Sequence, residues 1–327
     1  MGDSQLNTIQ DIQEFLKDDI KSVEKCMLDQ ANGYFPDFAV ALELLLSSGG
    51  KRIRPIIALL TGKMLNGDNQ RLIMLASAIE LLHTATLVHD DLIDEALLRR
   101  GNPTLNAKWS TSATILTGDF LFSCAAKLAA DTDSLAVMKL FSQTLITIVN
   151  GEITQLLDPY TEDRKKTYYE RIYSKTASLF ETSACAAAII STNDQQTIND
   201  MKEYGCNLGL AFQIIDDVLD FTGNEKNIGK PVGSDIKQGI ITLPAIIYAE
   251  THPEDILIKN LLSKNKLGNG EIDQLVQSIN NSNSIEQSLL EAKKHTEIAI
   301  NKINSFNDSY EKELLIELAY FLTQRDI

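Results

Sequence analysis

Turn-forming residues are scarce in this sequence. Its 327 residues include only 17 glycines and 7 prolines, the residue types that most often end or interrupt a helix. Apolar residues recur at three- and four-residue spacing through most segments, and strand-like alternation is not sustained. Pro55, Pro244 and Pro253 each stand where a helix is expected to begin. The sequence predicts an all-α protein with few strands or none.

Basic residues are also in the minority. The chain has 30 lysines and arginines against 45 aspartates and glutamates, a formal net charge of −15. Nucleic acids and anionic membranes bind clustered cations, so this balance argues against both partners. No apolar run approaches the roughly 20 residues that span a bilayer. The N-terminal residues MGDSQL show neither a secretion nor a myristoylation signal. We expect a cytoplasmic protein without a stable membrane anchor.

Cysteines are few and far apart, and their spacing matches neither a zinc site nor a redox pair. We interpret them as reduced core thiols: Cys26, Cys124, Cys185 and Cys206. No loop is long enough to be an interdomain linker, and there is no low-complexity stretch. The sequence therefore predicts a single domain over residues 1–327, built from ten or more helices of ordinary length.

One pattern occurs twice: D-D-x-x-D, at residues 90–94 and 216–220. On a helix, the first and last aspartates of each copy lie one turn apart on the same face. Because these like charges repel and their flanks are apolar, a cation must compensate them. Magnesium fits, since it takes few protein oxygens and keeps positions for water and phosphate. One copy alone is as often a solvated acidic face, but two copies in apolar surroundings favour a metal site. The predicted ligands are Asp90, Asp91, Asp94, Asp216, Asp217 and Asp220.

Basic and polar residues stand near both clusters. Residues 49–55 (GGKRIRP) place three cations on a glycine-containing turn at a helix start, which suits phosphate, although alone they fit a solvated loop equally well. Arg99 and Arg100 follow the first cluster. His83 lies seven residues before Asp90 on the same helical face, and Gln213 precedes Asp217 by one turn. These positions predict a diphosphate site.

Together these residues resemble the trans-polyprenyl diphosphate synthases of the isoprenoid synthase superfamily. The match runs from about Ser48 to Pro244. Besides the residues already named, the matching segments within this range are Gly118-Asp119, Gly151-Glu152, Lys175-Thr176 and residues 229–231 (GKP). The resemblance implies a bundle of helices around a deep central cavity, with the two aspartate motifs facing each other across its mouth. It also implies about three Mg²⁺ ions per site and a homodimer, with a heteromer as the alternative.

In such an enzyme, isopentenyl diphosphate is added to an allylic diphosphate such as farnesyl or geranylgeranyl diphosphate. The resemblance assigns the isopentenyl diphosphate to Lys51, Arg54, His83 and Arg100. It assigns the allylic diphosphate and its developing charge to Arg99, Lys175, Thr176, Gln213 and Lys230. The chain departs from the pattern at Ile240, where many relatives carry the lysine of a D-x-x-x-G-K segment; Lys237 is the candidate substitute.

Product length is inferred from the residues before the first motif. Ala85 and Thr86, about one turn before Asp90, are both small, whereas relatives that stop at short products often place an aromatic residue there. The motif also has no two-residue insertion. Phe141 is a further bulky candidate for the floor of the tunnel and equally suits the core. We expect an all-trans product of C30 to C50.

Four alternatives stay open at this point. A terpene cyclase would share the fold but usually has a different second metal motif, and a noncatalytic partner subunit would usually lack one or both motifs. A synthase making a shorter C15–C20 product, or a catalytic subunit of a heteromeric synthase, would keep both aspartate motifs.

Overall fold

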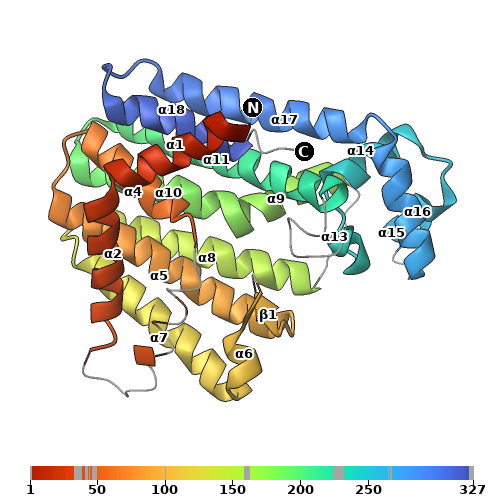
Figure 1. Ribbon diagram of the computed structural model, residues 1–327, viewed down its shortest axis with the longest axis horizontal. Helices are drawn as coiled ribbons and strands as arrows, with labels where there is room; N and C mark the ends of the chain where they lie inside the picture. The colour runs from red at the N-terminus through yellow and green to blue at the C-terminus, as the bar shows by residue number, and fades with distance from the viewer. Residues whose placement is uncertain are drawn as a thin grey trace. The chain divides into compact units, whose positions relative to one another are not determined.

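The computed structural model describes residues 2–32, 39–40, 43, 45, 50–99, 101–157, 163–223, 232–263, 265 and 267–323. The predicted all-α class is confirmed (Figure 1). Within these ranges the only strands are β1 (Leu98–Arg99) and β2 (Asn102–Pro103), which form a short antiparallel hairpin. Gly101, with φ of 77°, makes its turn.

The chain divides into two compact units. Unit 1 contains Met1–Ile146, Leu179–Gly205 and Lys302–Leu318, and unit 2 contains Thr147–Ser178, Cys206–Asn301 and Ala319–Ile327. Five helices have residues in both units: α8 (Leu135–Leu157), α10 (Ser178–Ser191), α11 (Gln195–Thr222), α17 (Ser284–Ile303) and α18 (Tyr310–Thr323). Organisation as one domain over 1–327 stays a prediction.

Unit 1 is built around α5 (Asn69–Ile93). Asp68 caps this helix by accepting a hydrogen bond from the backbone N–H of Arg71. Around α5 pack α2 (Lys17–Asp29), α4 (Ile53–Met64) and α7 (Thr111–Ala130), as Figure 1 shows. Unit 1 also contains α1 (Gly2–Phe15), α6 (Leu105–Lys108) and the β1–β2 hairpin. By length and composition α5 and α7 resemble membrane spans, but 67% of the apolar window of α5 is buried, as in a core helix.

Unit 2 contains α9 (Arg164–Ile172), the π-helix η1 (Tyr173–Ala177), α13 (Ser234–Lys237), α14 (Leu243–Thr251), α15 (Ile256–Leu262) and α16 (Asn269–Asn280). The helices α13, α14 and α15 each pack on α16. Phe221, Leu275 and Ile279 lie at the centre of this packing and are at most 1% exposed. Their burial attaches the end of α11 to the C-terminal helices, which matters because α11 carries the second aspartate cluster.

The proline signals were correct twice. Pro55 and Pro244 lie in the first turns of α4 and α14. The start inferred from Pro253 was wrong, because α15 begins at Ile256. Asp255 caps that helix by accepting hydrogen bonds from the N–H groups of Leu257 (2.7 Å) and Ile258 (3.2 Å), so the side-chain cap sets the boundary.

Candidate active site

The first aspartate cluster lies at the C-terminal end of α5. Asp91 is buried, and its Oδ1 accepts a 2.7 Å hydrogen bond from Nε of Arg99. Asp90 is half-buried, and Asp94 is the exposed C-cap residue of the helix. Arg99, predicted to hold the allylic diphosphate, is therefore paired here with the middle aspartate, whose buried charge it compensates. Asp90 and Asp94 are the two carboxylates of this cluster nearer to solvent.

A glycine lets α7 approach the residue that precedes this cluster. A Cβ on Gly118 would lie 2.2 Å from Nε2 of His89, so no larger residue fits without displacing the imidazole. That nitrogen lies 3.2 Å from the carbonyl oxygen of Ile115 and 3.7 Å from Oδ1 of Asp119. The Gly118-Asp119 pair thus fixes His89 and, with it, the end of α5.

The cations predicted to bind isopentenyl diphosphate belong to unit 1, like the first cluster. Lys51 is exposed just before α4, and Arg54 is half-buried in its first turn. The guanidinium carbon of Arg54 lies 4.9 Å from the centre of the Phe180 ring, a cation–π contact that restrains this side chain. His83 is half-buried on α5.

Lys175 and Thr176 lie on a π-helix, η1, directly after α9. Single π-turns are rare and often occur at functional sites, because they shift the side chains that follow them. The exposed Lys175 forms a 3.2 Å ion pair with Glu152 on α8. A Cβ on Gly151 would lie 2.3 Å from Oγ of Ser174, so this glycine permits the close approach of α8 to η1.

The middle aspartate of the second cluster, Asp217, is buried on α11 and held by uncharged donors. Its Oδ2 accepts a 2.7 Å hydrogen bond from the hydroxyl of Tyr168, and its Oδ1 accepts a 2.8 Å bond from Nε2 of Gln213. Oε1 of Gln213 accepts in turn from the hydroxyl of Thr176 at 2.7 Å. Two of the predicted allylic-diphosphate residues are thereby connected to this aspartate.

Burial dominates the electrostatics of this network. Loss of hydration raises the pKa of Asp217 to about 7, although the hydrogen bonds from Gln213 and Tyr168 favour the charged form. Burial, reinforced by the neighbouring Asp217, also raises the pKa of Tyr168 well above its usual value. Tyr168 is therefore a hydrogen-bond donor at any physiological pH.

The outer aspartates of the second cluster differ from each other. Asp216 is exposed. Asp220 accepts three hydrogen bonds at the N-terminal end of α13: from the hydroxyl of Ser234 (2.7 Å), the N–H of Ser234 (3.2 Å) and the N–H of Asp235 (3.1 Å). Asp220 thus fixes the start of α13, and Asp216 is the carboxylate of this cluster that faces solvent.

The predicted chain-length residues lie in or near the core. Ala85 is 0% exposed and Phe141 is 2% exposed. Thr86 is half-buried, and its hydroxyl donates to the carbonyl oxygen of His83 at 2.7 Å. Two predicted site residues, Arg100 and Lys230, lie outside the described residues, as does the rest of the 229–231 segment.

Sequence reasoning missed Tyr168 and Ser234. Each supports an aspartate that is distant in the chain, by 49 residues for Tyr168 and by 14 for Ser234. The one available signal for Tyr168 was its place seven residues before Lys175, about two helical turns. No spacing rule marked Ser234.

The carboxylates of the two clusters fit a hard divalent cation, most of whose ligands are oxygens of water and phosphate. Among the described residues, no group of three or more His, Cys, Asp or Glu side chains is arranged to enclose a metal. Asp90 and Asp94 in unit 1, and separately Asp216 in unit 2, offer hard carboxylate oxygens in numbers too low for a closed protein cage within either unit. Magnesium is usually bound in this way, by one or two carboxylates together with substrate phosphates.

Comparison with known proteins identifies the family. The polyprenyl synthetase family matches residues 36–279. The chain belongs to the polyprenyl synthetases. It is 34% identical over its full length to the octaprenyl diphosphate synthase of Haemophilus influenzae, which is covered completely. It is 35% identical to heptaprenyl diphosphate synthase component 2 of Bacillus subtilis, over 95% of this chain and 89% of that one.

A solved structure extends this similarity to three dimensions. The polyprenyl synthase of Caulobacter crescentus, crystallised with calcium and isoprenyl diphosphate, aligns with a TM-score of 0.88 and 30% identity, over 97% of this chain and 98% of that one. The prediction of a medium- or long-chain trans-polyprenyl diphosphate synthase is confirmed at the level of family and enzyme class. The roles of individual residues in this polyprenyl synthetase stay predictions.

Asp217 should make the metal-free protein less stable as the pH rises. An unfolded aspartate ionises near pH 3.9, but folded Asp217 has a pKa of about 7. Between these values the folded state holds the extra proton, so this contribution is fully present below about pH 3.9 and is lost as the pH rises through about 7. In EDTA, the Tm of Asp217→Asn minus the Tm of the wild type should therefore increase as the pH rises from about 5 to about 8.

The control for this measurement is Asp273→Asn, which changes an exposed aspartate on α16. Its Tm difference from the wild type should stay constant across the same pH range. A constant difference for Asp217→Asn as well would show that Asp217 is ionised throughout, against the burial argument.

Proposed function

We propose that this chain joins isopentenyl diphosphate to an allylic diphosphate and repeats the condensation to give an all-trans polyprenyl diphosphate of C30 to C50. The observation that carries the proposal is the duplicated D-D-x-x-D on two helices of a polyprenyl synthetase, with a buried middle aspartate in each copy. The names of the relatives support the length, since they include octaprenyl and heptaprenyl diphosphate synthases.

The chemistry begins with the loss of pyrophosphate from the allylic substrate. The allylic carbon–oxygen bond breaks, and negative charge develops on the leaving group. Lys175 and Thr176, with Gln213, are the proposed donors to that group. Lys51, Arg54 and His83 hold the second diphosphate so that its alkene attacks the allylic cation. A proton then leaves the new carbon cation, and the departed pyrophosphate is the proposed acceptor.

Mg²⁺ is the proposed cofactor, with Asp90, Asp94 and Asp216 as direct ligands and about three ions per site. Bound there, the ions supply positive charge that stabilises the leaving pyrophosphate. The calcium found with the Caulobacter relative supports a divalent oxygen-bound cation. Asp91, Asp217 and Asp220, which already accept hydrogen bonds from protein donors, are proposed to orient the direct ligands.

Release of pyrophosphate tests the reaction class. The purified chain with magnesium should release pyrophosphate only when both isopentenyl diphosphate and farnesyl diphosphate are present. Release of pyrophosphate from farnesyl diphosphate alone, at the same rate, would indicate a cyclase instead, because a cyclase breaks the allylic carbon–oxygen bond without a second substrate.

We also propose that the active form is a homodimer, paired through α8. Ile146, Val149, Ile153 and Leu156 follow each other at three- and four-residue spacing and are 44% to 64% exposed, a stripe of the kind that pairs helices. The alternative occupant is a dissimilar subunit, because the Bacillus relative is named as one component. Light scattering should give twice the chain mass of 36.2 kDa, and Ile146→Glu with Ile153→Glu should halve it. A wild-type monomer would favour the dissimilar subunit.

A further inference from the structure

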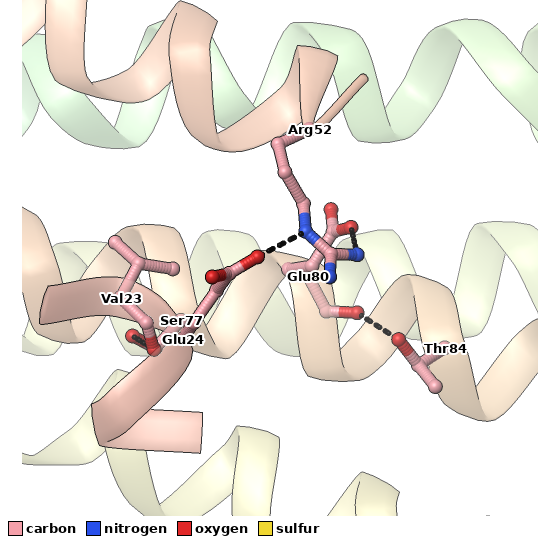
Figure 2. Close-up of polar contacts among 6 residues, drawn as sticks. All are labelled: Val23, Glu24, Arg52, Ser77, Glu80 and Thr84. Atoms are coloured by element: carbon pink, nitrogen blue, oxygen red, sulfur yellow. Dashed lines mark hydrogen bonds and ion pairs between the residues drawn. The ribbon is translucent and has the colours of Figure 1, made fainter. Parts of the chain in front are cut away.

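Arg52 is the middle cation of the basic loop, and most of its side chain is covered by neighbouring helices. Its side chain is only 11% exposed, whereas Lys51 beside it is exposed. Nη1 of Arg52 donates to Oε1 of Glu80 on α5 at 3.0 Å, and Nε donates to Oε1 of Glu24 on α2 at 3.2 Å. Figure 2 shows both carboxylates directed at the guanidinium. Arg52 therefore joins the start of α4 to two other helices.

The two acidic partners are not equivalent. The side chain of Glu80 is 8% exposed and that of Glu24 is 41% exposed. A charge as buried as that of Glu80 is tolerated only with a close cation, so the Arg52–Glu80 pair is the firm part of the bridge. The carbonyl oxygen of Glu80 also accepts a hydrogen bond from the Thr84 hydroxyl at 2.8 Å. Glu80 thus belongs to the helix that carries His83 and the first aspartate cluster.

The backbone of Arg52 is in an unusual conformation. Its φ of 52° and ψ of 36° are left-handed, a region that residues other than glycine rarely adopt. Its carbonyl oxygen accepts the first hydrogen bond of α4, from the N–H of Ile56 at 2.9 Å. The conformation of Arg52 therefore sets the direction in which the chain approaches α4 at Lys51. It also sets the rotation of α4 about its axis, and with it the position of Arg54.

We propose that Arg52 is a positioning residue for isopentenyl diphosphate. Its bridge to Glu24 and Glu80 holds the left-handed turn, and the turn aims Lys51 and Arg54 at the diphosphate. Two nitrogens of the Arg52 guanidinium already donate to carboxylates. Arg52 is therefore better placed to hold the loop in position than to bind the substrate itself. The role rests on the proposed function, in which Lys51 and Arg54 bind this substrate.

The decisive variant is Arg52→Gly. Glycine adopts the left-handed conformation without strain, so this change removes the bridge and keeps the turn available. The KM for isopentenyl diphosphate should rise about tenfold, while kcat and the KM for farnesyl diphosphate stay within about twofold. Glu80→Gln should act in the same direction, and Glu24→Gln should raise the KM about twofold to threefold. The KM of Arg52→Lys for isopentenyl diphosphate should lie between those of the wild type and Arg52→Gly. A single ammonium group cannot reproduce the planar, two-sided hydrogen bonding of a guanidinium group.

The chain offers a matched control in Lys63. Its Nζ lies 2.9 Å from Asp19, so this ion pair also joins α4 to α2, at the opposite end of α4. Lys63→Met should lower the Tm without changing either KM. It separates a loss of helix packing from a loss of substrate positioning.

The outcomes are distinct. A wild type that condenses the two substrates while Arg52→Gly keeps its KM for isopentenyl diphosphate would overturn the proposal, as would an equal rise in both KM values. If Arg52→Gly does not fold, Glu24→Gln decides, because it leaves the Glu80 pair in place; an unchanged KM would again overturn the proposal. If the wild type condenses nothing, the proposed function fails, and that failure is visible before any variant is made.

Discussion

Replacing Asp90 or Asp216 with alanine should lower kcat by a factor on the order of 10³ or more while far-UV helicity and Tm stay close to those of the wild type. The reason is electrostatic: leaving-group charge is usually stabilised most by charges held in place before the reaction. Asp90 is half-buried and Asp216 is exposed, so neither carboxylate is needed to fill the core. Initial rates of pyrophosphate release at saturating magnesium give the comparison.

Matched controls come from exposed aspartates on other helices. Asp11→Ala in unit 1 and Asp273→Ala in unit 2 remove one exposed carboxylate each and should keep the full rate. Isothermal titration with magnesium and a nonreactive allylic diphosphate analogue provides a second readout, in which the Asp90 and Asp216 variants should lose metal-dependent binding. Wild-type activity in either variant would remove that aspartate from the proposed metal site.

The second large effect is expected at the predicted chain-length positions. Thr86→Phe should shift the product from C30–C50 to C15 or C20 and keep a substantial rate of first condensation. The ring would lie about one helical turn, about 5 Å, from Asp90 along α5, a distance comparable to the advance of the tail by about one isoprene unit. Products are sized by mass spectrometry after the first turnovers and at completion.

Position 86 gives a cleaner test than position 85. Ala85 is 0% exposed, so Ala85→Phe adds a ring to a filled core at a cost of about 1 to 3 kcal/mol. Thr86 is half-buried, and the substitution Thr86→Phe removes its hydrogen bond to the carbonyl oxygen of His83. Thr86→Val removes that bond without adding a ring and should leave the product unchanged. An unchanged product in a folded, active Thr86→Phe would show that the tail takes another path.

Much of the fold could be predicted because its signals are local. The apolar periodicity predicted the helices, and prolines marked the first turns of α4 and α14. The D-D-x-x-D spacing correctly placed both clusters on helices, α5 and α11. The start of α15 was misplaced because the N-cap residue Asp255, and not Pro253, sets the first residue of this helix.

What could not be predicted depends on contacts between distant segments. Nothing in the sequence distinguished buried Asp217 from exposed Asp216, because the surroundings of Asp217 include Tyr168, which lies 49 residues away in the chain and donates a hydrogen bond to it. Likewise charge and spacing alone did not separate Arg52 from Lys51 and Arg54. The resemblance gave Arg52 no role, and the structure places it against Glu24 and Glu80. The π-turn at Lys175 depends on packing that the periodicity of the sequence does not record.

The product made by the purified chain alone is the most direct test of the central claim. The chain is incubated with magnesium, farnesyl diphosphate and an excess of isopentenyl diphosphate, and the products are dephosphorylated and sized by mass spectrometry. We predict a series of linear all-trans prenols in five-carbon steps that ends between C30 and C50. Products appearing only after a second protein is added, or a cyclic hydrocarbon in place of the series, would contradict the claim that this polyprenyl synthetase elongates the chain by itself.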